Sequence, residues 1–354
     1  MTPKKFYSFL IAVLSLLCLE GQNIEMVIAK NVVFVEKAES YFNRGVKMLR
    51  SGEYSKSIKS FRKAIELKGE EWEEAYNNIG LAYLQMGIYD TAMQNFQYVV
   101  SLNDLNHNAY VNMGMVQSFQ GEDSIALKNF TKAIEINHNA TGVYYLRAQL
   151  YESYGDYDNA IGDYERALGV DPDFFEAYVN KASLYIELEL YDKASIDVEK
   201  ALSLKGESPK LYNVLGQLYI NSQNWEEALN SFNKALGLDK RHVESMNNKG
   251  RVYFLLEDYH EARRWFTKAT DFDPNYVYAM NNLGSTEILL ENFDEAIEVF
   301  TQAIKIDSRY APAYYNRAIA HEKINEFDDA CEDWYDALDL GYEDAREHIK
   351  IECK

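Results

Sequence analysis

The sequence has 354 residues, of which 47% are hydrophobic and 26% charged, and it contains 28 tyrosines but only 5 prolines and 18 glycines. Such a composition is typical of packed helices rather than of turn-rich β structure or a disordered chain. The formal net charge of -20 argues against nucleic acid and anionic lipid as partners, because phosphate groups are bound by concentrated basic surfaces.

The first residues have the pattern of a targeting segment. Lys4 and Lys5 precede an apolar run over residues 6–19, and the small Gly21 offers a cleavage point. The run is short for a bilayer span but matches the apolar region of a signal peptide. We therefore predict a signal peptide or membrane leader over residues 1–21 and a leader segment over 22–37. A lipid anchor on Cys18 and an uncleaved membrane anchor are the alternatives. All three place the protein outside the cytoplasm, in the periplasm or at the outer membrane.

The rest of the chain is one repeated unit, with a period of 34 residues seen in the spacing of His107, Thr141 and Phe175. Nine repeats span residues 38–72, 73–106, 107–140, 141–174, 175–208, 209–242, 243–276, 277–310 and 311–342. A repeat of this length predicts a stack of small helical units, each of which shares its core with its neighbours.

Each repeat has the pattern of a helix hairpin. Its eighth residue is Gly or Ala, its twentieth is Ala in eight repeats, and its twenty-fourth is aromatic in eight. Apolar residues lie three or four apart in two runs, which is helical spacing. A turn separates the runs, with Gly at Gly52, Gly87, Gly121 and Gly155 in the first four repeats. The later repeats replace this Gly with Glu189, Gln223, Glu257, Glu291 and Asn325, which leaves the geometry of their turns open.

The large, small, Ala, aromatic pattern over 34 residues resembles the tetratricopeptide repeat. The resemblance implies an all-α, right-handed superhelical solenoid of nine hairpins, with a capping helix over residues 343–354. Ala345 and Ile349 are expected to face inward on that helix. It also implies a non-catalytic scaffold for protein or peptide partners, with the first helix of each repeat lining a concave groove. The leader and the ending around Cys331 and Cys353 resemble secreted repeat proteins of Bacteroidetes-type bacteria.

The sixth residue of seven repeats is Asn, which is unusual inside a helix. This row comprises Asn43, Asn78, Asn112, Asn180, Asn248, Asn282 and Asn316, and a second Asn precedes it at Asn77, Asn247 and Asn281. The row resembles the asparagine ladder of the O-linked N-acetylglucosamine transferases, which grips peptide backbone. That likeness predicts a peptide track, because a carboxamide both donates and accepts hydrogen bonds. The alternative is that these Asn side chains serve helix packing.

The row is interrupted at Leu146 and Val214, and Tyr145 and Val179 lie beside the interruptions. We expect these four residues to make the middle of the groove apolar, so that it accepts apolar side chains of a client.

No pattern of residues supports catalysis, a cofactor or a metal ion. Phosphate loops, nucleophile elbows and paired metal ligands are absent, and the six histidines are scattered. Cys331 and Cys353 are expected to meet, where they either form a disulfide or remain two buried thiols. The competing function is a glycan- or small-ligand-binding repeat module at the cell surface. The oligomeric state is left open.

Overall fold

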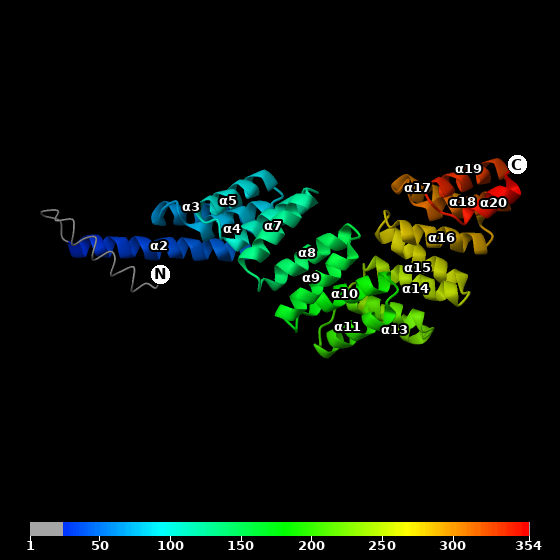
Figure 1. Ribbon diagram of the computed structural model, residues 1–354, viewed down its shortest axis with the longest axis horizontal. Coiled ribbons are helices and arrows are strands. Elements are labelled where there is room, and N and C mark those ends of the chain that lie inside the picture. The colour runs from blue at the N-terminus through cyan, green and yellow to red at the C-terminus, as the bar shows by residue number, and fades with distance from the viewer. Residues whose placement is uncertain (1–23, 354) are drawn as a thin grey trace. The chain divides into compact units, whose positions relative to one another are not determined.

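The computed structural model describes residues 24–353, which form helices and turns without a strand (Figure 1). The predicted signal peptide or membrane leader over residues 1–21 lies outside the described residues. The chain divides into two compact bodies, residues 1–171 and 172–354, which we call the N-terminal and C-terminal bodies and describe separately.

Helices alternate as the first and second helix of successive hairpins. In the N-terminal body they are α2 (Ile24–Arg50), α3 (Tyr54–Lys68), α4 (Glu73–Gln85), α5 (Tyr89–Leu102), α6 (His107–Phe119), α7 (Asp123–Ile136), α8 (Thr141–Ser153) and α9 (Tyr157–Val170). In the C-terminal body they are α10 (Phe175–Glu187), α11 (Tyr191–Ser203), α12 (Pro209–Asn221), α13 (Trp225–Leu238), α14 (Val243–Leu255), α15 (Tyr259–Phe272), α16 (Val277–Leu289), α17 (Phe293–Ile306), α18 (Ala311–Lys323), α19 (Phe327–Asp339) and α20 (Ala345–Glu352). The prediction of an all-α solenoid of nine hairpins and a capping helix is confirmed.

The long helix α2 and the short helix α20 form the two ends of the repeat array. The first helix begins at Ile24, so most of the predicted leader segment over residues 22–37 is continuous with α2. At the other end, α20 has the expected inward face, since Ala345 is fully buried and Ile349 packs against the same core cluster.

The core of each hairpin is a close contact between the eighth and twenty-fourth residues. In six repeats a Gly faces a Phe ring, and a Cβ added at Gly216 would lie 2.4 Å from Cε1 of Phe232. In the other three repeats the eighth residue is Ala, and Tyr164, Val198 or Trp334 replaces the Phe. Only Gly fits opposite the Phe ring, because the two helices lie too close together to leave room for a Cβ atom.

The turn between the two helices is left-handed in every repeat, with or without Gly. Gly87 has φ 71°, and Glu189, Glu257 and Glu291 have φ 57°, 60° and 62°. The Glu, Gln and Asn residues that replace Gly in the later turns therefore keep the same backbone conformation. A side chain makes this left-handed conformation less favourable than it is for Gly.

Restoring Gly at these turns is expected to stabilise the fold. Glu257→Gly and Glu291→Gly should each raise the free energy of unfolding by about 0.5–1 kcal/mol, because the left-handed strain outweighs the extra entropy of an unfolded Gly. Urea denaturation followed by circular dichroism measures this. Glu298→Gly, inside α17, is the control and should lower stability by about 1 kcal/mol. A loss of stability in the two turn variants would contradict the prediction.

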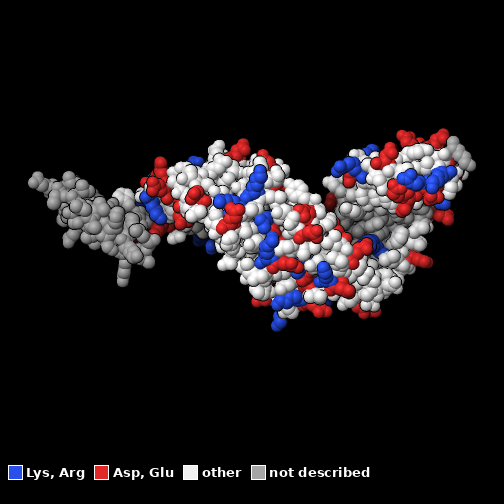
Figure 2. Space-filling model, in the orientation of Figure 1, with Lys and Arg blue, Asp and Glu red and all other residues white. Residues whose placement is uncertain are grey.

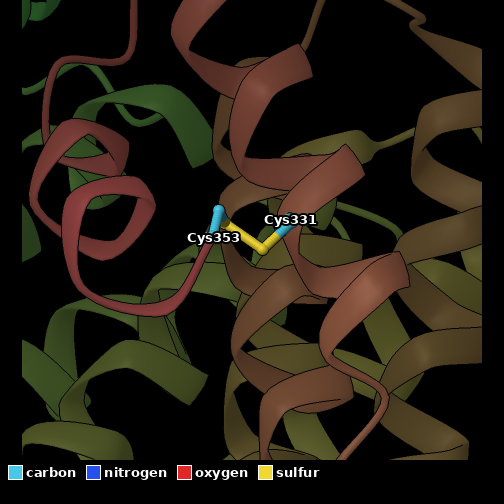
Figure 3. The surroundings of a disulfide bond; sticks show 2 residues. All are labelled: Cys331 and Cys353. Carbon is cyan, nitrogen blue, oxygen red and sulfur yellow. A yellow bond between two sulfur atoms is a disulfide. The ribbon is translucent and has the colours of Figure 1, made fainter.

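A disulfide closes the C-terminal end (Figure 3). Cys331 on α19 and Cys353 after α20 are joined, with their Cα atoms 5.7 Å apart. The cap also covers Trp334, which is fully buried and stacks on His348 with ring centroids 4.7 Å apart. The bond therefore holds the cap helix against the last hairpin. None of the helices among residues 24–353 is both long and apolar enough to cross a membrane.

Candidate functional site

Asparagines at the fifth and sixth places of neighbouring first helices form pairs. In each pair the sixth-place Nδ2 donates to the Oδ1 of the fifth-place Asn of the preceding repeat, at 2.8–3.0 Å. The pairs are Asn112 with Asn77, Asn248 with Asn213, Asn282 with Asn247, and Asn316 with Asn281. Four members of the predicted row thus link successive repeats through one amide N–H each.

The pairs follow a rule that is visible in the sequence. Where the fifth-place residue is Val, as at Val111 and Val179, the residue 35 positions later is apolar too, namely Leu146 and Val214. The interruptions of the row therefore occur where a sixth-place amide would face Val. Asn213 lay outside the predicted row, and comparing each fifth-place residue with the one 35 positions later is the signal that could have found it.

The remaining members of the row differ in their surroundings. Asn180 is buried, whereas Asn43 is exposed and Asn78 is half-buried. Asn43 lies in the first repeat, and the repeat before that of Asn78 has Phe42 at its fifth place, so neither has an Asn partner in a preceding repeat. Their side chains make no hydrogen bond to other described residues. These two amides are the members of the row whose hydrogen-bonding groups are available to a ligand.

Two of the predicted groove residues are not available to a ligand. Val179 is 3% exposed and Val214 is 0% exposed, and both belong to one core cluster with Ala182 and Leu211. The expectation that they make the groove apolar is therefore wrong. They are apolar because they pack between α10 and α12. Tyr145 is half-buried and lies against Tyr164, with ring centroids 5.9 Å apart.

The fourth predicted groove residue, Leu146, lines a pocket of about 230 Å³ between α6 and α8. Its lining is mostly apolar and comprises Met115, Ser118, Phe119, Phe130, Leu146, Gln149, Leu150 and Ser153. Phe119 is 63% exposed at the pocket edge, and its ring stacks on Tyr89 at 6.2 Å. The N-terminal body therefore presents an open apolar cavity, with neutral polar groups around it, on its first helices.

The comparisons with known proteins agree with this architecture. Models described as the tetratricopeptide repeat match residues 38–71, 73–104, 143–174, 175–208, 207–275, 242–309 and 281–346. The chain belongs to the tetratricopeptide repeat family. Proteins built from tetratricopeptide repeats generally bind proteins or peptides and are usually not catalytic. No curated protein sequence is significantly similar to the chain.

Solved structures show the same fold. The crystal structure of the APC/C hetero-tetramer Cut9-Hcn1 superposes with a TM-score of 0.62 and 17% identity, covering 75% of this chain and 52% of that one. The structure of pilF from Pseudomonas aeruginosa gives a TM-score of 0.52 and 17% identity, covering 58% of this chain and 94% of that one. At this identity the likeness concerns the fold alone.

One face of the molecule is mixed in charge. On the face shown in Figure 2, basic side chains lie among acidic ones, and no broad basic field is present. A ring nitrogen of His321 and carboxylate oxygens of Glu326 and Asp329 come within 4.8 Å of one another across the turn after α18. Sequence spacing gave no sign of this cluster, because its members lie on both sides of the turn. His321 and Glu326 already pair at 2.7 Å, and we assign the cluster no metal.

A half-buried histidine is expected to make one tetratricopeptide hairpin sensitive to pH. His242 caps α14, with its Nδ1 accepting from the backbone N–H of Ser245 at 3.3 Å. Burial lowers the pKa of His242 below its ordinary 6.5, although Glu244 and Asp239 oppose the shift. A protonated Nδ1 cannot accept this hydrogen bond, so the folded state favours the neutral ring.

The stabilising effect of neutral His242 should be complete above about pH 6.5 and should be lost as the pH falls below it, because the unfolded chain then binds more protons. His242→Asn should remove this loss, since Asn106 occupies the same place in another repeat and caps α6. The measurement is the unfolding free energy of both proteins from pH 7.5 to 5.5. A stability difference that stays constant over this range would contradict the role given to His242.

Proposed function

We propose that the protein is a non-catalytic scaffold that binds polypeptide segments on the first helices of its repeats. The observation that carries this proposal is the pocket at Leu146, a mostly apolar cavity lined largely by first helices, which are the helices expected to line the groove. Its volume of about 230 Å³ accommodates one apolar side chain of a ligand. Apolar side chains of this kind supply most of the binding energy when they are buried at an interface.

Asparagines lie on the same face as the pocket. Met115 lines the pocket and is three residues from Asn112 on α6, so the two side chains are neighbours along the helix. Asn112 itself is buried and pairs with Asn77, whereas the half-buried Asn78, at the same place of the preceding first helix, keeps its amide available to a ligand. A bound segment would thus place an apolar side chain in the cavity while its backbone meets the Asn row.

The test uses peptides selected from a random library on the immobilised full-length chain, with affinity measured by fluorescence anisotropy. The double variant Phe119→Ser with Leu146→Gln should weaken binding by about tenfold or more, because both lose apolar contact with the ligand. Ile125→Gln is the matched control, since Ile125 is also an exposed apolar residue but lies on a second helix, α7. Equal affinity for the wild type and the pocket variant would refute the proposal.

The Asn row needs a separate pair of variants. Asn78→Ala removes an amide that makes no hydrogen bond to the described residues, so it should leave stability unchanged and weaken binding if the row is a peptide track. Asn282→Ala breaks the pair with Asn247 and should lower stability by about 1 kcal/mol. If Asn78→Ala leaves the affinity for every selected peptide unchanged, the row serves packing alone.

We also propose that the protein works outside the cytoplasm, either free in the periplasm or associated with a membrane. The support is the disulfide between Cys331 and Cys353, since disulfides persist in oxidising compartments. Alkylation of free thiols in freshly broken cells, before and after reduction, tests this proposal. Two cysteines protected before reduction would agree with it, and two free thiols would contradict it.

A further inference from the structure

An apolar edge runs along the C-terminal ends of two neighbouring first helices in the C-terminal body. We define the leucine-glutamate edge as Leu255, Leu256 and Glu257 of the seventh repeat and Leu289, Leu290 and Glu291 of the eighth. Leu255 is 51% exposed, Leu256 45% and Leu289 47%, and helices α14 and α16, which carry them, contact each other. Large exposed leucines at equivalent places of adjacent repeats mark an interaction surface more often than single ones do.

Each leucine pair is followed by a glutamate whose side chain is available. Glu257 and Glu291 are exposed, and they form no ion pair with the other described residues. Their left-handed φ angles of 60° and 62° occur where the N-terminal body has Gly87, Gly121 and Gly155. The sequence therefore keeps a carboxylate beside the leucines at places where Gly is the more favourable residue.

The charge of the edge favours a cationic partner. Arg251, one turn before Leu255 on α14, donates its Nη1 to Asn248 Oδ1 at 3.2 Å. This bond to a neutral amide leaves the charge of Arg251 in place, but the two carboxylates beyond the leucines outnumber it and form no ion pair with the described residues. A partner with the complementary chemistry brings apolar side chains to the leucines and cations to the glutamates.

We propose that the leucine-glutamate edge docks an amphipathic polypeptide segment whose apolar side chains are flanked by Lys or Arg. This inference names a partner class and so rests on the proposed scaffold function. The leucines supply the apolar contact, and the two glutamates select for basic flanks and against acidic ones.

The probe is a short designed peptide with leucines at helical spacing and flanking lysines, compared with isomers whose lysines are replaced by Gln or Glu. Affinity for the full-length chain is measured by fluorescence anisotropy at low and at physiological salt. The double variant Glu257→Gly with Glu291→Gly should lower the affinity for the lysine peptide by about two- to fivefold for each carboxylate. Its affinity for the Gln peptide should stay unchanged. This variant is expected to be more stable than the wild type, so lost binding cannot be ascribed to unfolding.

Two further variants complete the design. Glu199→Gln with Glu295→Gln removes the same two charges from the second helices α11 and α17 and should keep the affinity for the lysine peptide. The double variant Leu256→Gln with Leu289→Gln should lower the affinity for both the lysine and the Gln peptide by about tenfold.

Four outcomes would overturn the inference. The first is equal affinity for the lysine and glutamate peptides, and the second is an equal loss of affinity in the two double-glutamate variants. The third is peptide binding that survives the loss of both leucines. The fourth is self-association of the chain that the leucine variant abolishes. The last outcome would place a second copy of the protein on the edge. The pocket variant at Phe119 and Leu146 is measured in parallel with its own selected peptides. If the pocket variant loses binding and the edge variants do not, only the present inference is rejected. If the pocket variant keeps its binding, the scaffold function is rejected.

Discussion

Replacing Asp163 with Ala is expected to lower the free energy of unfolding by about 3–5 kcal/mol, because it leaves a buried guanidinium without its partner. Asp163 is 0% exposed and accepts from Arg147 Nε at 2.6 Å and from Arg147 Nη2 at 2.9 Å. Burial alone would lower the pKa of Arg147, but the hydrogen bonds and charge of Asp163 raise it above its ordinary value. Arg147 also donates to Thr131 Oγ1 at 2.9 Å, so it links two repeats.

The chain itself supplies the control for this variant. At the equivalent places of the eighth repeat, Leu283 and Val299 pack together in an apolar cluster. The double variant Arg147→Leu with Asp163→Val should therefore recover most of the lost stability, since a well-packed apolar pair commonly replaces a buried ion pair without loss. Urea denaturation of the two variants gives the comparison. A double variant as unstable as Asp163→Ala would show that the fourth repeat needs the ion pair itself.

Replacing Gly216 with Ala should destabilise the protein by about 1–3 kcal/mol, although Ala is the better helix former, because the added methyl group overpacks the hairpin. The new Cβ would lie 2.4 Å from Cε1 and 2.6 Å from Cζ of Phe232, which is fully buried. The ring therefore has no space into which it can move, and α12 and α13 have to separate.

A compensating change should relieve this strain. In the fifth repeat Ala182 stands in place of the Gly, and Val198 stands in place of the Phe. Gly216→Ala with Phe232→Val should thus be more stable than the sum of the two single changes by about 0.5–3 kcal/mol, the range of coupling between residues in contact. Strictly additive effects would mean that the two side chains do not limit the helix separation.

The sequence predicted most of the fold because the repeat makes each core place visible nine times. Gly216 and Phe232 belong to places that recur in every hairpin, and so does the turn residue. The pattern within one repeat does not show which residues of neighbouring repeats are in contact. Val179 and Val214 resembled groove residues because first helices have an exposed side, and only the packing of α10 on α12 shows that both are buried.

The candidate site was predicted in outline. Leu146 was expected to be apolar groove lining and does line a pocket, but the exposed Phe119 beside it follows no repeat pattern. The pairing of Asn248 with Asn213 depends on one repeat's fifth place facing the next repeat's sixth, which is a tertiary relation. The proximity of Cys331 and Cys353 was predicted, whereas formation of the bond also depends on the redox conditions around the protein.

The most direct test of the scaffold function is photo-cross-linking in native extract. A photoreactive amino acid is placed at Phe119, at the pocket on α6, or at Ile125 on α7, two exposed apolar positions on the first and second helices of one repeat. We predict that polypeptides cross-link to the probe at residue 119 and that those adducts are absent at residue 125 and from the Leu146→Gln variant. The same adducts at both positions, or none at residue 119, would contradict a scaffold that binds polypeptides on its first helices.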